Sequence, residues 1–111
     1  MRELIKKILT ESENEWDWVN QESLMPLSDY VSYNNITNLN ELTGLKIQLS
    51  PKSEYYIEQL QQNSNDRANP IGVYGIITGE DTYDYDLPLK VAWENGTKNN
   101  YNVFDLDVVL Q

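Results

Sequence analysis

The chain has 111 residues, 40% of them hydrophobic, and 18 acidic against 8 basic side chains give it a formal charge of −10. This length suits one domain with one modest core, and the negative charge argues against direct contact with a nucleic-acid backbone. The absence of cysteine and histidine excludes disulfides, thiolate chemistry and the side chain that most often acts as general base or metal ligand. No stretch approaches the roughly 20 apolar residues that cross a bilayer, so we expect no membrane partner and a cytoplasmic protein.

Residues 2–11 predict a short amphipathic helix, with apolar side chains on one face at Leu4, Ile5, Ile8 and Leu9. Ten residues are too few for an isolated stable helix, so we treat 1–13 as an N-terminal helix or leader that either docks on another surface or is frayed in solution. Residues 14–43 have weak periodicity but are too aromatic for plain disorder. We predict an extended arm that packs on the remaining domain through Trp16, Trp18 and Tyr30.

Strand patterns become clear in residues 44–111, which we take as the folded domain. Alternation of Leu45, Ile47 and Leu49 with polar residues predicts a half-buried strand. Ser53 is placed to cap a short helix whose packed side is predicted to carry Tyr56, Ile57 and Leu60. Further strands are expected over 71–78, 87–93, 97–103 and 108–110, with a bend or bulge at Gly72 and Gly75 and a helical turn at Asp105-Leu106. The pattern favours a mainly β fold, a small five-stranded SH3-like barrel.

The turn at residues 94–96 decides which side chains share a face. A two-residue turn at Asn95-Gly96 would split the apolar residues between two faces. A three-residue loop with Gly96 in the left-handed region instead pairs Trp93 with Thr97. The inward Asn99 amide then needs backbone partners. The predicted core set is Leu89, Val91, Trp93, Asn99 and Tyr101, with Gly96 supplying the turn.

Tyrosines on loops or on the outward strand face, together with the carboxylates of the acidic hairpin tip at residues 79–86, are the candidate partner contacts. They are Tyr55, Tyr56, Tyr74, Tyr83, Tyr85, Glu80, Asp81, Asp84 and Asp86. Tyrosine is enriched at interfaces, and flanking acids suit a partner with a basic surface, although ordinary surface tyrosines are an equally good explanation. The acidic spacing does not match an EF-hand loop, so a solvated loop is favoured over a Ca²⁺ site. Nothing fixes a carboxylate pair in a pocket, so we expect no catalytic residue, no metal and no cofactor.

Several of these residues together resemble a known module. The pattern Gly72-x-x-Gly75-x-Ile77, Leu89-x-Val91-x-Trp93-x-Asn95-Gly96-x-x-Asn99-x-Tyr101 and Asp105-Leu106 resembles the SH3-like repeat called the MIB/HERC2 domain. It is still more similar to small barrels in tailed-phage proteins, in which a Ser-x-Tyr such as Ser53-Glu54-Tyr55 and an Asn-Pro such as Asn69-Pro70 recur with this hairpin. The resemblance covers roughly residues 44–109. It implies a domain that recognises protein or peptide and carries no catalysis.

Three functional hypotheses follow. The leading one is a non-enzymatic protein-interaction module, a phage accessory protein that binds a host or phage protein in the host cytoplasm. The second is an acidic inhibitor that mimics nucleic acid and blocks a host defence protein, motivated by the charge of −10. The third is a packaged virion protein, because Leu9-Thr10-Glu11 resembles the sites cut by phage prohead proteases and would make residues 1–11 a capsid-targeting leader.

Overall fold

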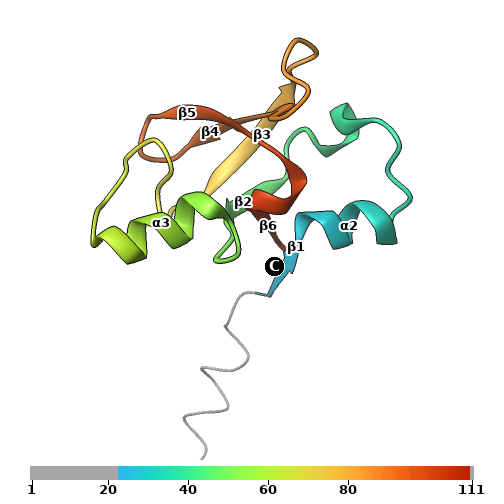
Figure 1. Ribbon diagram of the computed structural model, residues 1–111. Helices are drawn as coiled ribbons and strands as arrows, with labels where there is room; N and C mark the ends of the chain where they lie inside the picture. The colour runs from blue at the N-terminus through green and yellow to red at the C-terminus, as the bar shows by residue number, and fades with distance from the viewer. Residues whose placement is uncertain (1–22, 111) are drawn as a thin grey trace, which may run out of the picture.

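A computed structural model of the protein describes residues 23–110 and shows a mainly β domain (Figure 1). Six strands form one antiparallel sheet in the order β1-β6-β2-β3-β4-β5. The strands are β1 (Leu24–Pro26), β2 (Lys46–Leu49), β3 (Gly75–Glu80), β4 (Leu89–Trp93), β5 (Lys98–Tyr101) and β6 (Leu106–Val109). The helical segments are α2 (Leu27–Tyr33), α3 (Glu54–Gln62) and the short 3-10 helices η1 (Leu39–Leu42) and η2 (Val103–Asp105). The predicted helix over 2–11 and the predicted packing of Trp16 and Trp18 lie outside the described residues.

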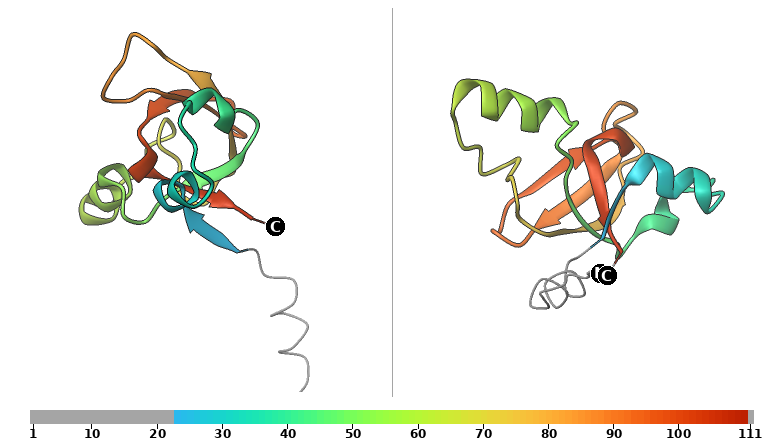
Figure 2. Two further views of the ribbon diagram at one scale, coloured as in Figure 1. Left: turned by 90° about the vertical axis from the view of Figure 1, so that its right-hand side faces the viewer. Right: turned by 90° about the horizontal axis from the view of Figure 1, so that it is seen from below.

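The sheet is strongly curved, as the left view in Figure 2 shows, and its inward side chains form one apolar core. Strand alternation supplies most of this core, because every second side chain of β2 and β4 points inward. Its buried members are Leu27, Leu42, Ile47, Leu49, Ile77, Leu89, Val91, Trp93, Tyr101, Leu106 and Val108. Within the described residues β1 and β5 are the two edges of the sheet and do not pair with each other, so the sheet is open.

The segment before residue 43 differs from the extended arm that the sequence predicts. Residues 24–26 form a sixth strand, in which Leu24 pairs with Val109, and α2 and η1 follow it. Leu27 and Leu42 are fully buried, so this segment completes the core instead of lying over it. Tyr30 packs against the core as predicted. The five-strand count was therefore wrong, because β1 extends the sheet beyond β6.

Helix α3 begins as predicted but turns a different face inward. The Ser53 side-chain oxygen accepts a hydrogen bond from the backbone N–H of Tyr55 at 3.2 Å, which confirms the N-cap. Ile57 and Leu60 are 41% and 66% exposed, whereas Gln59 is buried. The Gln59 amide donates to the carbonyl oxygens of Tyr55 and Asn69, so this glutamine satisfies backbone groups of the 63–70 loop. The hydrogen bonds that Gln59 makes to this loop therefore determine which face of α3 is buried. The spacing of apolar residues in the sequence does not reveal such bonds.

Strand boundaries shift where glycines bend the chain. Residues 71–74, expected to be strand, precede it instead: residues 71 and 72 form a turn with Gly72 at φ +76°, and β3 starts at Gly75. A Cβ on Gly75 would lie 2.6 Å from Cε3 of Trp93, so only glycine lets the indole lie this close to β3. The ladder irregularity lies between Ile77 and Gly79, later than the predicted bend.

Candidate functional site

The β4–β5 hairpin has the predicted register. The Trp93 backbone N–H donates to the Thr97 carbonyl oxygen at 2.8 Å, and Gly96 has φ +94°. Leu89 is paired with Tyr101, which places the predicted apolar residues on the inward face. Gly96 itself is exposed, so it belongs to the turn and not to the core. The hairpin therefore provides the fixed structure against which the neighbouring loops pack.

A hydrogen-bond network joins this hairpin to the loop before β3. The Trp93 Nε1–H donates to the Tyr101 hydroxyl at 3.0 Å, and that hydroxyl lies 2.7 Å from Oδ1 of Asn69 and 2.8 Å from the Ala68 carbonyl oxygen. The Asn99 amide, turned inward as predicted, donates to the same two oxygens. Burial raises the pKa of Tyr101 to about 12. The network holds the loop against the sheet and satisfies polar groups that would otherwise be buried unpaired.

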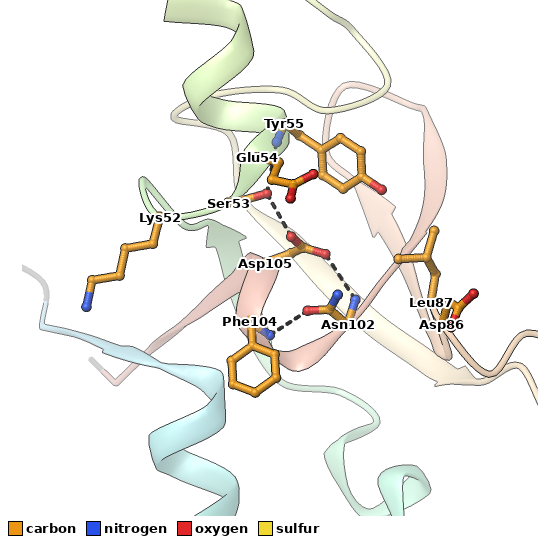
Figure 3. A pocket seen from close by; sticks show the side chains of 9 residues that line it. All are labelled: Lys52, Ser53, Glu54, Tyr55, Asp86, Leu87, Asn102, Phe104 and Asp105. Carbon is orange, nitrogen blue, oxygen red and sulfur yellow. Dashed lines mark hydrogen bonds between the residues drawn. The ribbon is translucent and has the colours of Figure 1, made fainter.

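A second polar contact joins the start of α3 to η2. The Ser53 hydroxyl donates to Oδ1 of the buried Asp105 at 2.8 Å, and Oδ2 of Asp105 accepts from the Asn102 backbone N–H at 3.2 Å (Figure 3). The Tyr55 ring packs edge-on against the Tyr101 ring, with centroids 5.8 Å apart. Burial, followed by the negative charge of Asp105, raises the pKa of Tyr55. Residues that carry the family resemblance are thus brought together as internal supports.

The β3–β4 loop, residues 81–88, is shaped by its own carboxylates. Oδ1 of Asp81 accepts from the Tyr83 backbone N–H at 3.0 Å, and Oδ2 accepts from the Asn100 side chain at 3.0 Å. These hydrogen bonds hold the pKa of Asp81 below its usual value. Oδ1 of Asp84 accepts from the Leu87 backbone N–H at 2.9 Å. Two of the predicted contact residues therefore order the loop.

The same loop presents aromatic side chains to solvent. Tyr83 and Tyr85 are 95% and 93% exposed. Asp86 is exposed as well, and its carboxylate has no hydrogen-bond or ion-pair partner within residues 23–110. Glu80, at the end of β3, is half-buried and accepts a long hydrogen bond of 3.4 Å from the Asn40 amide.

A hollow lies on each side of loop 81–88. The first, which we call the α3–loop pocket, has a volume of about 450 Å³ and lies between the start of α3, η2 and the loop (Figure 3). It is lined by Lys52, Ser53, Glu54, Tyr55, Asp86, Leu87, Asn102, Phe104 and Asp105. The second, which we call the η1–loop pocket, has a volume of about 440 Å³ and is lined by Leu39, Glu80, Asp81, Thr82, Asp84, Tyr85 and Pro88. Loop 81–88 separates the two hollows, and carboxylates line both.

The remaining predicted contact residues lie elsewhere. Tyr56 is half-buried against the core, and the Lys46 ammonium lies 4.0 Å from the centroid of the Tyr74 ring. Neither tyrosine lines either pocket. Sequence reasoning missed Phe104, which is 69% exposed at the rim of the α3–loop pocket. The helical turn expected at Asp105-Leu106 lies earlier, at Val103–Asp105, and Leu106 begins β6, so the prediction left Phe104 outside the turn.

Within residues 23–110, no group of three or more acidic, histidine or cysteine side chains is arranged to hold a metal ion. None of the helices in this part of the chain is long and apolar enough to cross a membrane. Comparisons of the sequence with protein-family models and with curated proteins, and of the structure with solved structures, find no match.

Proposed function

We propose that this protein is a non-enzymatic protein-interaction module that binds a basic segment of a partner through loop 81–88. The observation that carries the proposal is the pair Tyr83 and Tyr85, 95% and 93% exposed on a loop held in shape by Asp81 and Asp84. Two fully solvated aromatic rings contribute nothing to the core, so we infer that they contact a partner and do not stabilise the fold. Tyrosine offers a large contact area with few rotatable bonds, which is why it dominates many binding loops.

The internal hydrogen bonds of the loop lower the entropic cost of binding. A loop already held by Asp81 and Asp84 loses less conformational freedom when a partner docks than an unsupported one. Asp86, which has no ion-pair partner among residues 23–110, and the overall charge of −10 attract a basic partner and raise the association rate. The described carboxylates support nucleic-acid mimicry less well, because Asp105 and Asp107 are buried.

We further propose that the sheet is an SH3-like barrel with an added strand. Strands β2, β3, β4 and β5 are neighbours in chain order, and β6 returns beside β2 after the 3-10 helix η2, a connectivity typical of such small barrels. Strand β1 then adds to β6 at the edge. With the resemblance to tailed-phage barrels, this supports a phage accessory protein whose partner is a phage or host protein.

A charge-matched binding experiment tests the proposal. The probe is an acetylated octapeptide of alternating arginine and glycine, followed by ¹⁵N NMR titration at about 0.1 M salt, where long-range attraction is largely screened. Saturable shifts are expected in the amides of residues 81–88. The double variant Tyr83→Ser/Tyr85→Ser keeps every charge and should weaken binding about tenfold, since truncating interface tyrosines commonly costs this much.

Tyr33→Ser is the matched control, because Tyr33 is 81% exposed at the end of α2, away from the loop in Figure 1. It should leave the affinity unchanged. Equal affinities for the wild type and the double variant would mean that the peptide senses only net charge, and the proposed role of the loop would fall.

A further inference from the structure

We propose that the α3–loop pocket receives the guanidinium group of an arginine side chain from the partner. The inference rests on the proposed function and names the side chain that the module selects. It is independent of Tyr83 and Tyr85, neither of which lines this pocket.

The pocket is preformed. It is built from the start of α3, from loop residues 86–87 and from η2 (Figure 3). The Ser53–Asp105 hydrogen bond ties the α3 and η2 walls together, and the Asn102–Asp105 bond fixes the N-terminal cap of η2. Its volume of about 450 Å³ lies in the range of small-molecule sites and exceeds the need of one side chain, so an arginine can enter with solvent beside it. A guest therefore need not remodel the backbone.

The charges of the wall favour a cation. Glu54 lines the pocket from the start of α3 and Asp86 lines it from loop 81–88, and neither carboxylate has an ion-pair partner in the described part of the chain. Lys52 also lines the pocket, but its ammonium points away from the other lining side chains in Figure 3. A carboxylate or phosphate would be repelled here, whereas an ammonium or guanidinium would meet two unpaired acids.

Aromatic rings at the rim favour guanidinium over ammonium. Tyr55 contributes its ring from α3, and Phe104 contributes an exposed ring from η2. A planar guanidinium stacks on aromatic faces and presents paired donors to a carboxylate, which a compact ammonium does not. Because Phe104 is 69% exposed, its ring is available to a guest. The combination of two free acids and two rings therefore matches arginine better than lysine.

Small probes separate this pocket from the rest of the binding surface. The ¹⁵N-labelled full chain is titrated with N-acetyl-arginine amide, with the lysine counterpart and with the citrulline counterpart, which is a neutral isostere of arginine. Arginine amide should produce saturable shifts in residues 53–55, 86–87 and 102–105, lysine amide weaker ones and citrulline amide none. Each of Glu54→Gln and Asp86→Asn should weaken arginine binding about threefold to fivefold, the effect of one solvent-exposed ion pair.

Glu58→Gln is the control for net charge, because Glu58 is an exposed acid on the same helix that does not line the pocket. Phe104→Ala tests the stacking and should reduce the preference for arginine over lysine. Equal shifts with citrulline, or equal weakening by Glu58→Gln and Glu54→Gln, would overturn the inference. If the octapeptide still depends on Tyr83 and Tyr85 while the pocket amides stay still, the proposed function stands and this inference fails. If arginine amide shifts the pocket amides but octapeptide binding does not depend on Tyr83 and Tyr85, this inference stands and the proposed role of the two tyrosines fails.

Discussion

Removing the hydroxyl oxygen of Tyr101 tests how much the hydrogen-bond network of the hairpin stabilises the fold. The change Tyr101→Phe deletes the hydroxyl that accepts from the Trp93 indole N–H at 3.0 Å and lies 2.7 Å from Oδ1 of Asn69. Asn69 Oδ1 keeps its bond from Asn99, but the buried indole N–H loses the partner that the structure shows. An unpaired buried donor costs about 1–3 kcal/mol, so we expect the free energy of unfolding to fall by about this amount.

Urea denaturation followed by circular dichroism measures this free energy, and the indole N–H resonance of Trp93 reports the broken bond directly. Tyr85→Phe is the matched control, because that side chain is 93% exposed and should change the free energy of unfolding by less than about 0.5 kcal/mol. In a double-mutant cycle with Trp93→Phe, the stability costs of the two substitutions should not add. The double variant has lost both the indole N–H and the hydroxyl, so no hydrogen-bonding group of this pair is left unpaired. A Tyr101→Phe variant as stable as the control, or strict additivity in the cycle, would refute the proposed bond.

Three further predictions concern the core and its ionisable groups. Gly75→Ala should destabilise the fold by about 1–3 kcal/mol by overpacking, and the same change should cost less when it is made in a Trp93→Leu background, because the nearest contact of the added Cβ is with the indole. Burial raises the pKa of Asp107, so the folded state holds its proton more tightly, and stability should fall as pH rises past the ordinary value of 3.8. Asp107→Asn should flatten that part of the urea-midpoint profile, and an unchanged slope would contradict the assignment. Because the pKa of Tyr101 is raised to about 12 from 10.0, stability should decline between these pH values, and an absorbance titration of Tyr101→Phe should lack the last-ionising tyrosine.

The hairpin was predictable because two independent constraints agree on one register. Only a three-residue loop puts Val91, Trp93 and Tyr101 on one face, and only Gly96 adopts the required left-handed turn without strain. The inward Asn99 followed from the same register, and its two acceptors lie where an amide needs them. The alternation of apolar residues and the need to bury them are therefore enough to predict the register of two strands that are short and joined by a tight turn.

The β1–α2 segment was not predictable in the same way. Leu24–Pro26 has no alternation long enough to indicate a strand, and it becomes one because the edge of β6 is available to pair with it. The buried face of α3 was missed for a related reason. Gln59 is buried because a distant loop needs its amide, although Leu60 is more apolar and remains 66% exposed. Non-local hydrogen bonds outweigh side-chain hydrophobicity at both places.

The residues that carry the resemblance are separate from the exposed side chains through which we propose that the protein binds a partner. Ser53, Asn69, Tyr101 and Asp105 are buried and bonded to one another's segments, so a change at any of them acts first on stability. The exposed residues around loop 81–88 make no such contacts and can be exchanged without weakening the core. Exchanges of the exposed side chains of loop 81–88 should therefore alter the binding that we propose without altering the fold, because the buried residues support the loop without contributing its exposed side chains.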